Sequence, residues 1–347
     1  MKTSEVKENL RGFEGYYMKY FLGVDIGNSK SHALIAAEDG RCAGFGAAGP
    51  GSWEAIGWEG AQEVLHSIVG QALAQSGIRP EAVAGSGFGY AGYDWPEDRP
   101  GHVAMIESLG LANAQYVLGN DTLVGLVAGA DQGWGVVVVA GTSNNCRGRD
   151  RNGREGRITG SGSWFGEYGG ATEIVAKAMQ AAAIAWTRRG PATALSAAFA
   201  AEVGARDTAD LLAGLVRGRY HLSAAAAPIV FATAEQGDAV AQEIISWAGR
   251  SLGDLANGVI RQLDLAAESF DVVLSGSLYK GGATLIDPLR QTIHAVAPGA
   301  NLVRLTAPPV VGGVLLGMEA CGLETTAVRA PLLASANEIM QQQVELV

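Results

Sequence analysis

The sequence predicts an α/β protein made of two related halves. Strand-length apolar stretches alternate with stretches of helical periodicity in the first half, an order typical of layered α/β proteins. A glycine- and hydroxyl-rich bend between two strands occurs twice, within 24–31 and again within 139–145. Each copy leads to an Asx-Gly pair, Asp39-Gly40 or Asn152-Gly153, which favours a type I′ turn because both central residues need positive φ. We therefore expect one strand hairpin of this kind in each half.

The elements of the first half follow from their apolar patterns. Tyr20 to Ile26 is expected as a buried strand and Ser31 to Ala37 as its hairpin partner. A helix should cover 59–76 and end at Gly77. Strand, helix, strand and helix then follow at 83–87, 105–109, 116–118 and 122–130.

The second half repeats the hairpin and then becomes mostly helical. A strand at 136–139 opens it, and helices are expected at 171–185, within 211–230 and at 239–263. Two later strands are expected, at 272–274 and 302–305, before a final helix that starts near Gly312-Gly313.

Composition limits the class of function. The 347 residues, of which 48% are hydrophobic, are enough for two domains with a substantial core. Asp and Glu number 35 against 25 Lys and Arg, and no basic run is long enough to follow a nucleic-acid backbone. We therefore expect neither nucleic acid nor an anionic membrane as a partner. Three widely spaced cysteines indicate neither a disulfide framework nor a zinc cluster, and a cytoplasmic location fits best.

The start of the chain is expected to stand apart from the fold. Its first seventeen residues contain no apolar segment of signal-peptide length, and Met18 directly precedes the first strand. We expect 1–18 to be a flexible leader or a start-site artefact. No window reaches the roughly 18 apolar residues that a membrane-spanning helix requires.

The two bends have the composition of anion-binding loops. Glycines let backbone N–H groups approach a ligand, and Ser or Thr hydroxyls add further donors. Two such bends facing each other would hold the phosphate tail of a nucleotide. Neither is a Walker motif, which needs Lys-Ser/Thr at the start of a helix, nor the dinucleotide fingerprint, because residues 31–37 continue as a strand. Below, residues 27–31 are called the first bend and residues 141–145 the second bend.

Six motifs follow one another along the chain. They are Asp25-Ile-Gly-Asn-Ser-Lys-Ser, Asn120-Asp121, Ala140-Gly-Thr-Ser-Asn-Asn-Cys146, Gly166-Glu-Tyr-Gly-Gly-Ala, Leu274-Ser-Gly-Ser and Val311-Gly-Gly-Val-Leu-Leu-Gly317. Together they resemble the ordered motifs of the N-acetylglucosamine kinase and BadF/BadG/BcrA/BcrD ATPase family, within the actin, hexokinase and Hsp70 superfamily. The resemblance covers about residues 19 to 323. It implies a two-lobed actin-like ATPase fold, ribonuclease H-like, with duplicated sheet-and-hairpin lobes and an interlobe cleft. It also implies ATP and Mg²⁺ as cofactors and an amino sugar as substrate, and leaves a homodimer open.

The repeated hairpin and the Gly-rich final helix predict how the chain divides. We expect residues 19–127 plus 312–325 to form an N-terminal ATPase and sugar lobe. Residues 128–311 should form a C-terminal lobe with the nucleotide site, and 326–347 a C-terminal tail.

Asp25 is the candidate metal ligand. An unpaired carboxylate at the end of a buried strand is costly, so it is either a hydrogen-bonded turn residue or a ligand of hydrated Mg²⁺, the role that the resemblance implies. Next to it, the residues of the first bend would meet the nucleotide phosphates, although Ser31 also fits an ordinary strand position. These cofactor-binding candidates are Gly27, Asn28, Ser29, Lys30 and Ser31.

Asp121 is the candidate catalytic residue. It follows a strand and Asn120 and precedes a helix, where an N-cap is the common structural role. A sugar kinase, however, needs a carboxylate that accepts the hydroxyl proton during phosphoryl transfer. The resemblance places Asp121 at this general-base position, with Asn120 beside the substrate.

Further candidates come from the second half. In the second bend, Gly141, Thr142 and Ser143 would bind phosphate, and Asn144 and Asn145 phosphate or sugar. Gly276 and Ser277 would approach adenosine or simply cap a helix. Cys146 matches a position near the sugar, although a packing role is equally consistent.

Two departures from the family pattern concern the sugar. Glu167 and Tyr168 align with an Asp-Glu-Gly segment that contacts sugar hydroxyls in the kinases, so Tyr168 replaces a carboxylate. Ser52 and Trp53 stand where the kinases carry an Asn for the N-acetyl group, and an exposed Trp could stack on a sugar or pack at a rim.

Three functions follow. The leading interpretation is an ATP-dependent amino-sugar kinase acting on N-acetylglucosamine at its 6-hydroxyl, with glucosamine or N-acetylmuramate as alternative substrates. The second is an ATPase that activates a radical dehydratase or reductase through an iron–sulfur cluster, for which Cys42, Cys146 and Cys321 show no local cluster. The third is a non-catalytic sugar sensor, favoured by the missing Asn and opposed by the presence of Asp25 and Asp121.

Overall fold

The computed structural model describes residues 18–111 and 114–344, so the predicted leader lies outside the described residues except for Met18. The strands are β1 (Tyr20–Ile26), β2 (Ser31–Ala37), β3 (Cys42–Ala48), β4 (Val83–Tyr90), β5 (Gln115–Asn120), β6 (Gly135–Ala140), β7 (Asn144–Arg149), β8 (Glu155–Arg157), β9 (Phe270–Ser275) and β10 (Ala300–Arg304). The α-helices are α1 (Trp53–Ser76), α2 (Arg99–Glu107), α3 (Asp121–Gly129), α4 (Ala171–Trp186), α5 (Leu195–Glu202), α6 (Thr208–Val216), α7 (Ala227–Glu235), α8 (Ala239–Gln262), α9 (Ala283–His294), α10 (Val310–Ala320) and α11 (Thr326–Val344). Short 3₁₀ turns are η1 (Pro80–Ala82), η2 (Pro96–Asp98), η3 (Gly162–Phe165), η4 (Ala224–Ala226) and η5 (Ser277–Gly281).

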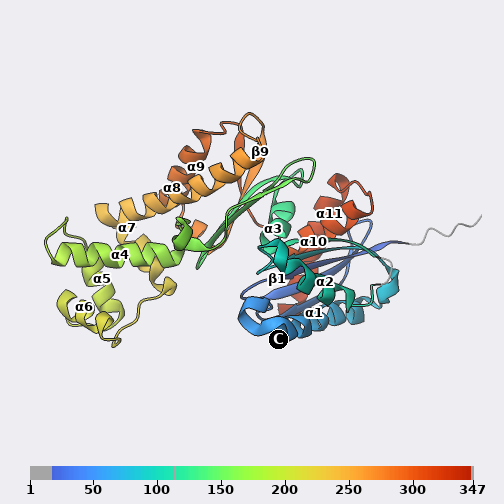
Figure 1. The fold of residues 1–347 in the computed structure, drawn as a ribbon, viewed down its shortest axis with the longest axis horizontal. Coiled ribbons are helices and arrows are strands. Elements are labelled where there is room, and N and C mark those ends of the chain that lie inside the picture. Colours follow the sequence, from blue (N-terminus) through green and yellow to red (C-terminus); the bar gives the residue numbers. More distant parts are fainter. Residues whose placement is uncertain (1–17, 112–113, 345–347) are drawn as a thin grey trace, which may run out of the picture.

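The strands form two five-stranded sheets of the same topology (Figure 1). The first has the order β3-β2-β1-β4-β5 and the second β10-β9-β6-β7-β8. In the first sheet β1 is antiparallel to β2 and parallel to β4; in the second, β6 is antiparallel to β7 and parallel to β9. The two predicted hairpins, β1–β2 and β6–β7, therefore lie on separate sheets.

The Asx-Gly pairs form a different turn from the one expected. They join β2 to β3 and β7 to β8, and only the glycines, Gly40 and Gly153, have positive φ, at 89° and 82°. The N–H of Gly40 donates to the Ala37 carbonyl, and the Ala37 N–H donates to the Arg41 carbonyl. This is a three-residue loop with a type I turn and a glycine in the left-handed region, so the prediction of type I′ turns was wrong.

Helices separate and cover the two sheets. Alternate residues of β1 face opposite sides: Val24 packs with α1 and α2, whereas Phe21 packs with α3, α10 and α11. Val137 of β6 and Val273 of β9 join this second cluster, so the layer of α3 and α10 forms one core with both sheets. The outer face of the second sheet packs against α4, α5 and α7 to α9, as with Val138.

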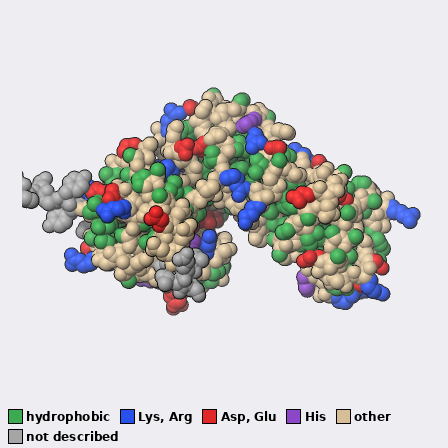
Figure 2. Space-filling view, turned by 180° about the vertical axis from the view of Figure 1, so that it is seen from behind, with side chains coloured by type: hydrophobic (Ala, Val, Ile, Leu, Met, Phe, Trp, Pro, Cys, Tyr) green, Lys and Arg blue, Asp and Glu red, His purple; other side chains and the backbone are tan. Residues whose placement is uncertain are grey.

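Seen from behind, two bulky parts are joined along one edge and separated by an open notch (Figure 2). Acidic and basic side chains are interspersed on this face (Figure 2). Within residues 18–111 and 114–344, no helix has both the length and the apolar content that crossing a bilayer requires.

Several elements were not predicted. β3, of seven residues, and β8, of three, lie at sheet edges. α1 begins at Trp53 because a turn of helix precedes a kink at Gly57, whose φ is 74°. Residues 326–344, expected as a tail, form α11. Leu332 and Ala336 of α11 are fully buried in the core that contains α10, so this segment is part of the fold.

Glycines let the backbone of α10 lie directly against the backbones of its neighbours α3 and β4. A Cβ on Gly312 would lie 1.9 Å from the carbonyl oxygen of Val124 in α3, and one on Gly87 of β4 would lie 2.2 Å from the carbonyl oxygen of Gly313. These contacts are with backbone atoms, so no side-chain rearrangement can relieve them. The helix and the sheet would have to separate to admit a methyl group.

We expect Gly312→Ala to lower the free energy of unfolding by about 1 to 3 kcal/mol, the usual cost of overpacking, despite the better helix propensity of alanine. Urea titration of both proteins measures the difference. Gly70→Ala is the matched control, because Gly70 lies in α1 and nothing lies within 4 Å of its added Cβ. It should be neutral or stabilising by up to about 1 kcal/mol. Equal effects of the two substitutions would contradict this account of α10.

Candidate active site

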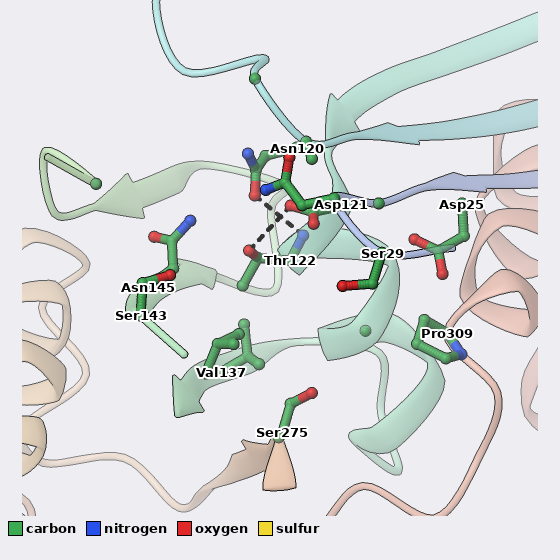
Figure 3. Close-up of a pocket in the computed structure, with 18 of the residues that line it drawn as sticks. Asp25, Ser29, Asn120, Asp121, Thr122, Val137, Ser143, Asn145, Ser275 and Pro309 are labelled. Atoms are coloured by element: carbon green, nitrogen blue, oxygen red, sulfur yellow. Dashed lines mark hydrogen bonds between the residues drawn. The ribbon is translucent and has the colours of Figure 1, made fainter. Parts of the chain in front are cut away.

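A cavity of about 460 Å³ lies between the two sheets, at the carboxyl ends of their central strands. Loops from both sheets line it, which agrees with the general place of ligand sites in α/β proteins. Figure 3 shows side chains from both bends and from the start of α3 around one space. From the candidates predicted above it contains Asp25, Gly27, Asn28, Ser29, Lys30, Asn120, Asp121, Ser143, Asn144, Asn145 and Gly276.

Asp25 is a buried carboxyl at the end of β1. It is 8% exposed, with β2 on one side and β4 on the other. Burial raises its pKa to about 8, with a further increase from the nearby Asp121 and a smaller opposing effect of Lys30. Without a bound cation, this carboxyl is therefore largely protonated near neutral pH.

Asp121 is the first residue of α3, and its neighbour Asn120 caps that helix. The Asn120 Oδ1 accepts a hydrogen bond of 3.0 Å from the Thr122 N–H. The N-cap role considered for Asp121 thus belongs to Asn120, which leaves the Asp121 carboxyl beside the cavity. Burial raises the pKa of Asp121 to about 6, while the Thr122 N–H and Arg147 oppose the increase.

The two bends have related backbone geometry. In the first, the Gly27 N–H donates to the Lys30 carbonyl at 3.1 Å; in the second, the Gly141 N–H donates to the Ser143 carbonyl at 2.9 Å. The start of α4 fixes the second bend, because the Ala171 N–H donates to the Gly141 carbonyl. Each bend is therefore a defined loop at the cavity edge, with exposed hydroxyls at Ser29 and Ser143.

A second cavity, of about 580 Å³, adjoins the second bend. Gly141, Thr142 and Ser277 line it, whereas their chain neighbours Ser143 and Gly276 line the first cavity. Its other walls are mostly apolar and come from η4, α7 and η5. They include Ala224, Ala225, Ala227, Pro228, Phe231 and Leu278.

The sequence from 22 to 317 matches the BadF/BadG/BcrA/BcrD ATPase family. The chain belongs to this family. The resemblance drawn from the motifs is confirmed.

Relatives of this family member span nearly its whole length. An N-acetylmuramic acid/N-acetylglucosamine kinase of Clostridium acetobutylicum is 26% identical over 306 residues, which cover 88% of this chain and 100% of that protein. An N-acetyl-D-glucosamine kinase of Dictyostelium discoideum is 26% identical over 312 residues, 86% of this chain and 97% of that protein.

A solved structure matches the fold. It is a candidate N-acetylglucosamine kinase of Chromobacterium violaceum, which superimposes with a TM-score of 0.62 at 24% identity and covers 86% of this chain and 99% of its own. Together with the two sheets of like topology, this match confirms the predicted two-lobed actin-like fold.

Four predicted site residues of this family member do not line the first cavity. Ser31 and Ser52 are at most 1% exposed, and neither Oγ has a hydrogen-bond partner within the described residues. Trp53 stacks on Trp58 at 4.4 Å between ring centroids, and its Nε1–H donates to the Gly92 carbonyl at 2.7 Å. Cys146 is fully buried in the core of the second sheet. Trp53 thus supports a cavity residue, Gly92, from behind.

Glu167 and Tyr168 also lie away from the lining. The Glu167 Oε1 accepts hydrogen bonds from the N–H and hydroxyl of Thr159, at 2.7 and 2.8 Å, and its Oε2 accepts one from the Gly162 N–H. Glu167 therefore orders the loop that carries Gly160, a cavity residue. Tyr168 packs against Trp247 of α8, with ring centroids 5.7 Å apart.

The lining residues that sequence reasoning missed include Glu54, Gly92, Asp94 and Gly160. Gly92 and Asp94 follow β4, a strand parallel to β1, so the position just after a parallel strand was the signal that could have found them. Glu54 is in the first turn of α1, where an acidic residue is usual and carries no functional signal.

We expect Asp25 and Asp121 to lower the stability of the ligand-free protein as the pH rises from about 4 to about 8, against an opposite contribution of His32, whose pKa burial lowers to about 4. Folding raises the pKa of Asp25 from 3.8 to about 8 and of Asp121 from 3.8 to about 6, so the folded state binds more protons than the unfolded state across this range. Rising pH therefore favours unfolding. Asp25→Asn should flatten the dependence, because the amide does not titrate.

Urea titrations with EDTA at several pH values measure this effect. Asp254→Asn, at an exposed position of α8, is the control and should keep the wild-type slope. Parallel curves for the wild type and Asp25→Asn would contradict the assignment of the titration to Asp25.

Proposed function

We propose that the protein is a sugar kinase that transfers the terminal phosphoryl group of ATP to an amino sugar, with N-acetylglucosamine and its 6-hydroxyl as the first choice. The observation that carries this proposal is that both bends, one from each sheet, line a single cavity together with Asp25 and Asp121. Phosphoryl transfer needs phosphate donors, a metal-binding carboxylate and a base in one place.

ATP would span the two cavities. The second bend borders both, so the phosphates would lie at this bend and adenosine in the largely apolar second cavity, against Phe231 and Leu278. An aromatic base and a sugar suit such a lining better than they suit the carboxylate-lined first cavity. The acceptor sugar would then occupy the first cavity near Asp121.

Asp25 is suited to hold Mg²⁺. It is a buried carboxyl with no ion-pair partner among the described residues. Its pKa is raised because burial makes the ionised form less favourable. Mg²⁺ would stabilise the ionised form and supply charge neutralisation to the phosphates, with water completing its coordination. No group of three or more His, Cys, Asp or Glu side chains within 18–111 and 114–344 is placed to hold a metal alone.

Asp121 is suited to act as the general base. With a pKa of about 6 it is mostly ionised at neutral pH, and it is a stronger base than an ordinary aspartate. Its position after Asn120, which caps α3, holds the carboxyl at the cavity rather than in the helix cap.

The proposed class of substrate is supported by the two relatives described above, since both are named as kinases of N-acetylated amino sugars. The choice of sugar and hydroxyl, a cytoplasmic location and a homodimer remain predictions from the sequence.

The direct test incubates the protein with ATP, Mg²⁺ and a panel containing N-acetylglucosamine, N-acetylmuramate, glucosamine and glucose, read by ADP release and product mass. ADP release that no sugar accelerates would contradict the kinase assignment.

Asp121→Asn should keep sugar and ATP binding but lower kcat by on the order of 10²- to 10⁴-fold, the usual contribution of a general base. The amide keeps the shape of the side chain and cannot accept the hydroxyl proton. Steady-state kinetics on the best sugar measure the loss, and calorimetry checks binding. A near-normal kcat would overturn the role of Asp121.

Asp25→Asn should show a different defect. Because a neutral amide binds Mg²⁺ more weakly than a carboxylate, productive Mg·ATP binding should weaken and high Mg²⁺ should restore part of the rate. A Mg²⁺ titration of activity in Asp25→Asn and Asp121→Asn distinguishes the two residues. Rescue of Asp121→Asn but not of Asp25→Asn would reverse their assignment.

A further inference from the structure

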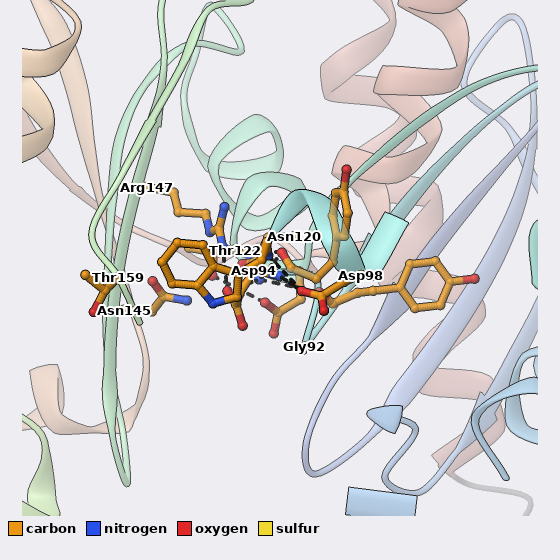
Figure 4. Close-up of polar contacts among 12 residues, drawn as sticks. Gly92, Asp94, Asp98, Asn120, Thr122, Asn145, Arg147 and Thr159 are labelled. Atoms are coloured by element: carbon orange, nitrogen blue, oxygen red, sulfur yellow. Dashed lines mark hydrogen bonds and ion pairs between the residues drawn. The ribbon is translucent and has the colours of Figure 1, made fainter. Parts of the chain in front are cut away.

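One ion pair joins the two sheets at the edge of the first cavity (Figure 4). The Arg147 Nη2 of β7 donates to the Asp94 Oδ1 at 2.6 Å and to the Tyr93 carbonyl at 3.4 Å. Asp94 lies in the loop after β4, so the pair connects the second sheet to the first. Both side chains are largely buried, with exposures of 7% for Arg147 and 23% for Asp94.

Asp94 is held rigidly from its own side of the cavity. Its Oδ1 also accepts a hydrogen bond of 3.3 Å from the Asn120 Nδ2, and its backbone N–H donates to the Asp98 Oδ2 at 3.0 Å. Next along the loop, Trp95 lies under the guanidinium of Arg157 from β8, 4.2 Å from the ring centroid. Arg147 and Arg157, both from the second sheet, thus contact this loop.

The second carboxylate oxygen of Asp94, Oδ2, takes no part in these side-chain hydrogen bonds. Within the described residues, Oδ1 accepts both side-chain hydrogen bonds of Asp94, and Oδ2 accepts none. Asp94 lines the cavity with Asn120 and Asp121, and Asn120 directly precedes the proposed base. A carboxyl oxygen without a partner, held beside the proposed base, is an acceptor available to a donor group of a ligand.

We propose that Asp94 binds the sugar through Oδ2, which accepts a hydrogen bond from a hydroxyl or N–H group, and that Arg147 is a positioning residue that holds Asp94 across the cavity. The proposal rests on the proposed kinase function. Ser52 and Trp53 do not line the first cavity, and in this proposal Asp94 supplies a polar contact to the sugar there instead.

The test compares three variants by sugar KM, ATP KM and kcat. Asp94→Asn keeps the shape, removes the charge and should raise sugar KM about 10- to 100-fold, the factor for losing a hydrogen bond to a charged group. ATP KM should stay within about twofold, since the phosphates lie at the bends. Arg147→Gln should also raise sugar KM, and the double variant should raise it no more than the larger single effect, because both act through one contact.

Arg149→Gln is the matched control. Arg149 is two residues along β7, and its Nη2 donates to the Glu319 Oε2 of α10 at 2.9 Å, so it also joins β7 to the part of the chain that packs on the first sheet. Neither residue lines the cavity. Sugar KM should be unchanged in this variant. An equal rise in Arg149→Gln would show that any link between the sheets has the same effect, and would overturn the positioning role of Arg147.

Calorimetric titration of the sugars without ATP separates this proposal from the kinase function. A wild type that binds a sugar without phosphorylating it would contradict the kinase function alone, and the weaker binding expected of Asp94→Asn would still support the sugar contact. Unchanged sugar affinity in folded Asp94→Asn, or no sugar binding by the wild type, would overturn the contact. If Asp94→Asn does not fold, Asp94→Glu keeps the charge, displaces the oxygens and should also weaken sugar binding while thermal unfolding remains cooperative.

Discussion

The cavity depends on the close packing of α3 and α10 between the two sheets. Both helices share one apolar core with strands of each sheet, and glycines bring α10 to backbone distance from α3 and β4. α3 begins at Asp121 and α10 directly after Pro309, and both of these residues line the cavity. The positive dipole ends of both helices therefore face the space where the proposed phosphates would lie.

This arrangement concentrates carboxylates that water does not solvate well. Asp25 and Asp121 come from neighbouring parts of the first sheet, and their mutual repulsion adds to the effect of burial on the pKa of Asp25. Arg147, from the other sheet, acts in the opposite direction on the pKa of Asp121. The charge state of the proposed base thus depends on groups from both halves, so that relative movement of the sheets would alter it.

The proposed phosphate loops and the proposed sugar site have different structural origins. The bends are short loops whose geometry is set by local hydrogen bonds, and each half of the chain carries one. The proposed sugar side is formed by loops after β4 and β8, which Trp53, Glu167 and Arg147 hydrogen-bond from outside the cavity. Substitutions in such supporting residues can change the shape of the sugar site while the phosphate loops stay intact, which agrees with the departures from the family pattern at Ser52, Trp53 and Tyr168.

The sequence by itself determined the strands of the two hairpins, the bends between them and the candidate carboxylates Asp25 and Asp121. These features are local: apolar period, glycine content and position at the end of a strand depend on residues close in the chain. It did not determine the turn type at Asp39-Gly40, since both turn types accept the same dipeptide. Nor did it determine the helical state of 326–344, whose buried residues gain their partners from elements distant in the chain, β3 among them.

Only the tertiary structure decided which side chains meet. Asp94 and Arg147 are 53 positions apart and pair because two separate sheets stand at a particular distance, which no local pattern encodes. In the same way, Glu167 bonds Thr159 and Gly162 instead of entering the cavity, and Asn120 rather than Asp121 caps α3. The physical reason is that backbone conformation follows from neighbouring residues, whereas the direction and partner of a polar side chain depend on how distant elements pack.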